Sequence, residues 1–177
     1  MWRWLLAVGL AGLVGCSSGG GPREERDLPE RIVVSSAAFD AEGVIPRRFT
    51  CAGENVSPPL RWSGVPDGTA AVALVVDDPD APRGTYVHWV VVGLDPASAR
   101  LDEGAVPAGA RQLPNSAGKA AWTGPCPPGG PAHHYRFTVY ALMRQPQVDG
   151  DTDPEAAVEA IEAAATARGR LVGTFGR

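Results

Sequence analysis

Short apolar runs separated by turn residues predict a mostly β chain. The runs that predict strands, being β-branched, alternating or almost wholly apolar, are residues 31–36, 60–62, 70–76, 85–94, 136–143 and 171–175. The runs at 70–76 and 85–94 are typical of central strands, and we expect them to be neighbours. A further short strand is predicted at 47–51, whereas residues 100–112 are weakly patterned and predict a connection.

One helix is predicted late in the chain. Asp153 suits the N-cap, Pro154 the first helical position, and Glu155 the first turn, where its charge favours the helix dipole. Residues 156–167 are expected to continue the helix, and Gly169 is expected to end it. Many strands with one late helix predict a β-sandwich with helical decoration.

Composition agrees with this fold class and excludes one class of partner. The chain has 177 residues with 22 Gly and 17 Pro, which favours turns and short strands over a helical bundle. Its formal net charge is -4, so it lacks the basic surface of a nucleic-acid-binding protein.

The first residues predict a lipoprotein signal peptide. A single Arg3 precedes an apolar run at 4–14, and Leu13-Val14-Gly15-Cys16 resembles a bacterial lipobox. We expect residues 1–15 to be the signal peptide, Cys16 to be lipidated, residues 16–30 to be a flexible tether, and residues 31–177 to be the domain. The domain would be extracytoplasmic and membrane-anchored, at the periplasmic face in a Gram-negative host. The alternative is an ordinary secretory signal in which Cys16 is incidental.

The other two cysteines fit such a compartment. Cys51 and Cys126 are an even number of thiols in an oxidising environment, which predicts a disulfide between two loops. The alternative is two unpaired thiols.

Two proline-stiffened turns, each close to histidines, carry the candidate chemistry. Residues 77–82 precede His88, and the Gly-Pro loop at 124–131 precedes His133 and Tyr135. Two imidazoles and a tyrosine hydroxyl could hold an anion such as phosphate. The backbone N–H groups of Gly124 and Cys126 could add donors.

Asp78 needs a separate explanation in an anion site. Its carboxylate could accept a hydrogen bond from a histidine ring and favour the charged ring, so that anion affinity would fall as pH rises above the histidine range. Other roles remain open: Asp78 could accept only backbone N–H groups of its turn, His88 could be a core histidine, and Tyr135 could serve packing. His134 is expected to face away from His133 and Tyr135, because side chains alternate along a strand.

These motifs together resemble the phosphatidylethanolamine-binding protein family, in its bacterial Raf-kinase-inhibitor-like branch. The matching segments are Cys-Ala-Gly-Glu-Asn-Val-Ser-Pro-Pro-Leu-Arg-Trp at 51–62, Asp-Asp-Pro-Asp-Ala-Pro at 77–82, His-Trp at 88–89, Gly-Pro-Cys-Pro-Pro at 124–128 and His-His-Tyr-Arg-Phe at 133–137. The resemblance implies a two-sheet antiparallel β-sandwich with a small Pro-rich pocket for phosphate-like anions or a phospholipid headgroup. It implies these ligand-binding residues: Asp78, Asp80, His88, Gly124, Cys126, His133 and Tyr135.

The function expected from this resemblance is that of a lipid-anchored binding module without cofactor, metal or catalytic residues. The alternative is an inhibitor or regulator that docks on a partner protein, a protease rather than a kinase. A zinc enzyme using Asp78, His88 and His133 is a third hypothesis. The sequence contains neither a Gly-x-Ser-x-Gly elbow nor a His-Glu-x-x-His pair to support catalysis.

Overall fold

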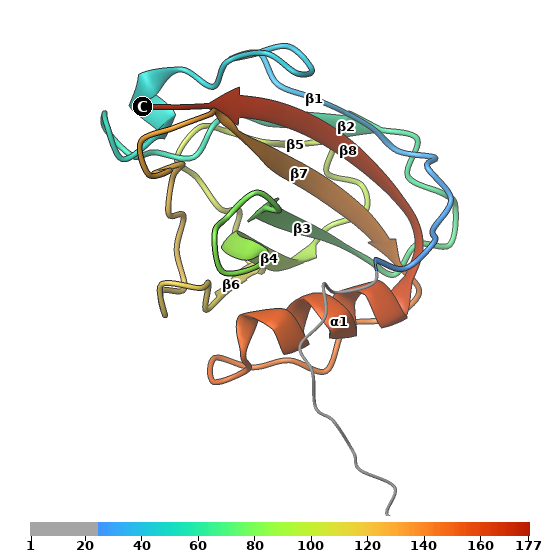
Figure 1. The fold of residues 1–177 in the computed structure, drawn as a ribbon. Coiled ribbons are helices and arrows are strands. Elements are labelled where there is room, and N and C mark those ends of the chain that lie inside the picture. The colour runs from blue at the N-terminus through green and yellow to red at the C-terminus, as the bar shows by residue number, and fades with distance from the viewer. Residues whose placement is uncertain (1–24) are drawn as a thin grey trace, which may run out of the picture.

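Two antiparallel sheets and one helix form the fold, which a computed structural model describes for residues 25–177 (Figure 1). The smaller sheet has the order β1-β2-β5, made of β1 (Val33–Ser35), β2 (Leu60–Ser63) and β5 (Arg100–Leu101). The larger sheet has the order β6-β4-β3-β7-β8, made of β6 (Arg111–Leu113), β4 (Tyr86–Leu94), β3 (Ala71–Asp78), β7 (His133–Leu142) and β8 (Ala165–Phe175). The predicted antiparallel β-sandwich is therefore confirmed.

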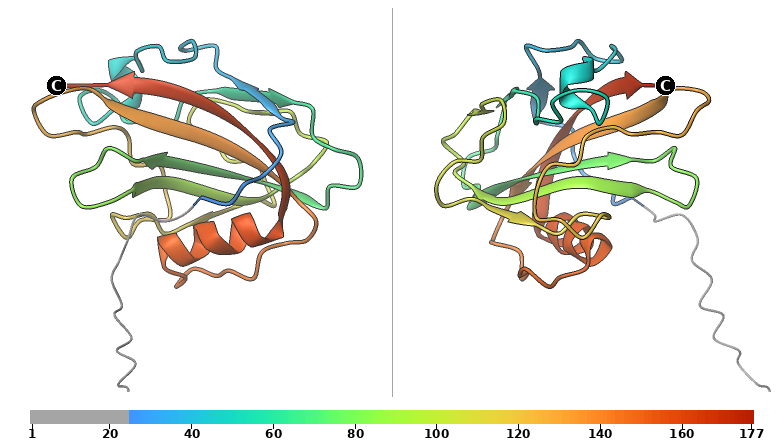
Figure 2. Two further views of the ribbon diagram at one scale, coloured as in Figure 1. Left: turned by 45° about the vertical axis from the view of Figure 1, so that its right-hand side comes forward. Right: turned by 90° about the vertical axis from the view of Figure 1, so that its left-hand side faces the viewer.

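The larger sheet is covered on both faces (Figure 2). Its inner face packs against the smaller sheet through side chains that include Leu74 and Phe137. Its outer face packs against α1 (Pro154–Ala164), where Val158 and Ile161 contact the cluster that contains Val75. Because β3 is buried at every position, it has the nearly continuous apolar run expected of a central strand, and it pairs with β4 as predicted.

The start of the helix is confirmed, but its end is not where the sequence predicts. Asp153 caps the helix by accepting hydrogen bonds from the N–H groups of Glu155 and Ala156. The helix stops at Ala164, Ala165 is extended, and β8 follows at once. Pairing with β7 along β8 outweighs the helix propensity of alanine, so the predicted helix over 156–167 and the predicted strand over 171–175 are both wrong in their boundaries.

Two short segments also differ from the prediction. Residues 47–51 were expected to form a strand, but Arg47–Phe49 is a 3-10 helix. The N–H and the hydroxyl of Thr50 both donate to the carbonyl of Arg47, and these local bonds close the turn. Residues 100–112 contain β5 and the first two residues of β6, and these strands are too short for a periodic pattern to reveal.

The described end of the predicted tether is packed against the domain. Residues 25–30 lie beside β8: Leu28 is buried in the cluster under α1, and Glu30 forms a parallel bridge with Arg168. The expectation of a flexible tether is therefore wrong for these six residues. The predicted signal peptide and the lipidation site at Cys16 lie outside the described residues. Within residues 25–177, no helix has the length and apolar character needed to cross a membrane.

Candidate functional site

A cavity of about 220 Å³ opens where β3 ends and where β4 and β7 begin. The antiparallel register places these strand ends together, since Asp78 pairs with Tyr86 and Asp77 pairs with Arg136. The cavity is lined by Asp78, Ala81, Pro82, Tyr86, His88, Thr123, Gly124, Cys126, Pro127, Pro128, His133 and Tyr135. Six of the seven predicted ligand-binding residues are among them.

Asp78 and His133 form a buried pair in this pocket. The Nδ1 atom of His133 lies 2.8 Å from Oδ2 of Asp78, and the two side chains are 11% and 5% exposed. The other carboxylate oxygen of Asp78 accepts from the N–H of Asp80 at 2.8 Å. Asp78 thus contacts both the histidine and its own turn, the two roles that the sequence left open. With Nδ1–H given to the carboxylate, Nε2 of His133 is the ring atom left for a ligand.

Two polar atoms in the pocket wall are buried without a partner. His88 donates its Nδ1–H to the carbonyl of Thr123 at 2.6 Å, while its Nε2 is buried and has no hydrogen-bond partner among residues 25–177. The hydroxyl of Tyr135, whose ring lies edge-on to that of His88, is also buried and has no hydrogen bond of normal geometry to a described residue, although the Asp78 carboxylate lies near it. Among the described residues, the one other buried side-chain N or O atom without a hydrogen-bond partner is Nε1 of Trp62. Because buried polar groups are costly when unpaired, a ligand or water is expected to bind here.

The protonation states of these two groups follow from their burial. Desolvation lowers the pKa of His88, so its ring is neutral at pH 7 and Nε2 carries a lone pair. Burial, reinforced by the nearby Asp78 carboxylate, raises the pKa of Tyr135, so its hydroxyl keeps its proton. The pocket therefore presents one hydrogen-bond acceptor beside a hydroxyl that can donate.

Asp80 lies outside the pocket. Its Oδ2 accepts from the backbone N–H of His134 at 2.8 Å and lies 2.7 Å from the Nδ1 atom of that ring. These hydrogen bonds lower the pKa of Asp80. Both side chains are exposed, and His134 points away from His133, as the strand pattern predicts. Asp80 is therefore not among the residues that line the cavity, and its carboxylate fastens the turn to β7.

Gly124 lines the pocket but does not offer its N–H to a ligand. That N–H donates to Oδ1 of Asn55 at 2.9 Å, which excludes the predicted donor role. A Cβ atom at Gly124 would lie 2.4 Å from the carbonyl oxygen of Phe49, so the position needs glycine for close packing. Cys126, two residues later in the same loop, forms a disulfide with Cys51, and the two Cα atoms are 5.4 Å apart.

The structure adds Asn115 to the site as a supporting residue. Its buried amide nitrogen donates to the carbonyls of His88 and Ala121 and lies 2.9 Å from Oγ1 of Thr123, while its oxygen accepts from the N–H groups of Ala117 and Lys119. This network positions the Thr123 carbonyl that orients His88. The sequence gives no signal for this role beyond an Asn-Ser pair typical of turns.

The zinc hypothesis finds no support in the arrangement of the described side chains. Within residues 25–177, no three His, Cys, Asp or Glu side chains are grouped so that they could hold a metal ion.

The buried, neutral His88 predicts a loss of stability in mild acid. Because the pKa of His88 is lower in the folded than in the unfolded protein, its contribution is complete above pH 6.5 and is lost as pH falls toward the folded pKa. The slope should reach up to about 1.4 kcal/mol per pH unit. Urea unfolding at several pH values between 7.5 and 5 measures this slope. The dependence of the unfolding free energy on pH should be weaker in His88→Gln and unchanged in His134→Gln. Equal slopes for His88→Gln and the wild type would contradict the prediction.

Sequence comparisons identify the family of this chain and several of its relatives. The sequence pattern of the family described as "Phosphatidylethanolamine-binding protein" matches residues 35–176. A Mycobacterium tuberculosis protein named "UPF0098 protein Rv1910c" is 47% identical over 156 residues, covering 85% of this chain and 75% of the relative. Another protein of that organism, named "Putative lipoprotein LppC", is 42% identical over 193 residues, covering 97% of this chain and 94% of the relative.

Solved structures agree with the sequence comparisons. The crystal structure of E. coli YbcL, described as a new member of the mammalian PEBP family, matches with a TM-score of 0.80 and 31% identity. It covers 83% of this chain and 99% of its own. The CT736 homologue from Chlamydia trachomatis matches with a TM-score of 0.76 and 35% identity, covering 84% and 99%.

Proposed function

Because this chain belongs to the phosphatidylethanolamine-binding protein family, we propose that it is a lipid-anchored binding module for a small anionic or phosphorylated ligand, such as a phospholipid headgroup. The observation that carries the proposal is the pair of buried, unpartnered polar atoms, Nε2 of His88 and the hydroxyl of Tyr135, which line one cavity with His133. Binding a ligand there would satisfy both atoms without any chemical step, so the proposed role is binding and not catalysis.

The donors and acceptors define the kind of ligand. The Tyr135 hydroxyl would donate to a ligand oxygen, and Nε2 of His133 would donate when the ring is protonated beside Asp78. The neutral Nε2 of His88 would accept from a protonated ligand oxygen or an ammonium group. The residues that line the cavity include neither Arg nor Lys. A singly charged phosphate, such as H2PO4−, or a phosphoethanolamine group therefore suits the site better than a multiply charged anion.

Membrane attachment through Cys16 is the second part of the proposal. The lipobox-like segment at 13–16 and the name of the relative LppC support it. The domain would then face an extracytoplasmic compartment, in which the bond between Cys51 and Cys126 persists.

Calorimetric titration tests the binding proposal. The chain from Ser17 onward is titrated with phosphate and with phosphoethanolamine, at acid and neutral pH. We expect saturable binding that weakens as pH rises and that His133→Ala reduces at least tenfold, which is about 1.4 kcal/mol. The matched control is His134→Ala, which removes the neighbouring imidazole on the opposite face and should leave the affinity unchanged. Equal affinity in His133→Ala would refute the pocket, and no binding of either compound would favour docking on a partner protein.

A further inference from the structure

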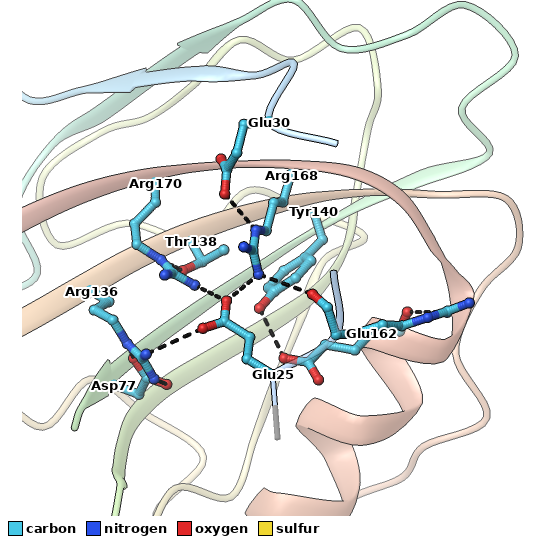
Figure 3. A network of polar contacts seen from close by, with 10 residues as sticks. Glu25, Glu30, Asp77, Arg136, Thr138, Tyr140, Glu162, Arg168 and Arg170 are labelled. Atoms are coloured by element: carbon cyan, nitrogen blue, oxygen red, sulfur yellow. Dashed lines mark hydrogen bonds and ion pairs between the residues drawn. The ribbon is translucent and has the colours of Figure 1, made fainter. Parts of the chain in front are cut away.

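Three arginine side chains converge on one carboxylate on the outer face of the larger sheet, beside α1 (Figure 3). They are Arg136 from β7 and Arg168 and Arg170 from β8. Oε1 of Glu25 accepts from both Arg168 and Arg170, and Oε2 lies 3.4 Å from Nη1 of Arg136. This group lies on the face opposite to the ligand pocket, because Arg136 alternates with the inward-facing Tyr135 and Phe137.

Each guanidinium is also held by a partner other than Glu25. Asp77 binds Arg136 through both oxygens, at 2.7 and 2.6 Å. Glu30 binds Nε of Arg168 at 2.6 Å, and Oγ1 of Thr138 accepts from Nε of Arg170 at 3.0 Å. The arginines are only 14–21% exposed. Partners other than Glu25 therefore orient the arginines, and with residues 25–30 in place the three side chains are partly buried, as in a preformed anion site.

The charges around this site leave room for one anion. The three arginines face two other carboxylates, those of Asp77 and Glu30, so without Glu25 these five groups carry one net positive charge. Glu162, which accepts from Tyr140, and Arg26, which donates to the carbonyl of Glu162, add one charge of each sign and leave this balance unchanged (Figure 3). Burial opposes the ionisation of Glu25, but the three arginines outweigh it and lower its pKa. Glu25 thus binds as a charged ligand supplied by the chain itself.

We propose that Arg136, Arg168 and Arg170 form a second anion site that takes a phosphate group in exchange for the carboxylate of Glu25. In the carboxylate complex one oxygen serves two arginines, whereas a phosphate group offers a separate oxygen to each of the three. The planar fork of arginine suits phosphate geometry. The phosphate belongs either to a free anion or to a phospholipid headgroup.

Because Glu25 is close to Cys16 in the sequence, a phospholipid headgroup would be able to reach the arginine site. Glu25 follows Cys16 by nine residues, which span at most about 30 Å when extended. A lipid on Cys16 would therefore hold this face within that distance of the headgroups. Residues 25–30 are fastened by further contacts, such as Arg26 to the carbonyl of Glu162 at 2.8 Å. Release of Glu25 would begin to free this segment and lengthen the tether.

Phosphate titration of the full chain carrying Cys16→Ser, in phosphate-free buffer, tests the proposal. The His133→Ala background is used so that the pocket does not contribute. We expect Glu25→Gln to raise the affinity for inorganic phosphate at least tenfold, because the internal competitor is removed. The matched control is Asp27→Asn, which makes the same charge change in the same segment at an exposed side chain that forms no ion pair with the three arginines, and it should change the affinity less than threefold.

A second substitution tests whether the arginines bind the phosphate. In the Glu25→Gln chain, Arg170→Gln should abolish the gain. If that protein fails to fold, Arg170→Lys, which keeps the charge but loses the fork, should reduce the gain at least fivefold. The proposal is overturned if folded Glu25→Gln binds neither phosphate nor lipid more tightly than Asp27→Asn.

Vesicles identify the source of the phosphate group. The same variants are sedimented with vesicles of phosphatidylglycerol and of phosphatidylcholine. Arg170-dependent binding to either vesicle assigns the site to a lipid headgroup, whereas binding of inorganic phosphate without vesicle binding assigns it to a free anion. These results do not depend on the ligand pocket, so failure here and failure of the pocket proposal are separate outcomes.

Discussion

Removing the Cys51–Cys126 disulfide is expected to lower the free energy of unfolding by about 4 kcal/mol. The bond joins residues separated by 75 positions, and a cross-link of that span restricts the unfolded chain strongly. Both cysteines are exposed in the folded protein, so burial of their sulfur atoms contributes little. The same bond holds the loop that supplies Pro127 and Pro128 to the pocket, so ligand affinity should fall as well.

Urea unfolding of the Cys51→Ser/Cys126→Ser variant, in the chain from Ser17 onward, measures this effect. The wild type in the presence of a reductant should show the same stability, and the reductant should not change the double variant. A loss below about 1 kcal/mol would mean that the unfolded chain is already constrained in this region.

Gly169→Ala is expected to cost about 3 kcal/mol of stability, an unusually large effect for one methyl group. Gly169 lies in β8, where a Cβ atom would sit 1.8 Å from the carbonyl oxygen of Ile32. That carbonyl belongs to the backbone of the packed N-terminal segment, so no side-chain rotation relieves the clash. The segment that begins at Glu25 would have to move away from β8.

The matched control for this prediction is Gly150→Ala. A Cβ atom at Gly150 meets nothing within 4 Å, and its backbone does not have a positive φ. Gly150→Ala should change the free energy of unfolding by less than about 0.5 kcal/mol in the same urea titration. Similar losses for both substitutions would show that the close approach of Ile32 to β8 is not rigid.

The pocket and the arginine group occupy opposite faces of the same strand. In β7, Tyr135 faces the pocket while Arg136 faces Glu25, and Asp77 and Asp78 divide in the same way between the two sites. The alternation of a strand therefore places two polar centres back to back, and each can be tested without removing a residue of the other.

The sequence by itself determined the features that depend on local chemistry. The apolar runs at 70–76 and 85–94 predicted β3 and β4, because a strand buried on both faces has no room for polar side chains. Asp153 and Pro154 predicted the start of the helix through capping. The resemblance of these motifs to a known family also named six residues that line the pocket.

Only the tertiary structure decided how those residues are used. The N–H of Gly124 donates to the side chain of Asn55, 69 positions away in the sequence. The backbone N–H of His134 donates to the carboxylate of Asp80, 54 positions away. The helix ends at Ala164 because pairing with β7 wins over helix propensity. Glu25 meets arginines more than 100 positions away. No local pattern encodes such contacts, because each depends on which distant atoms the completed fold brings within hydrogen-bonding distance.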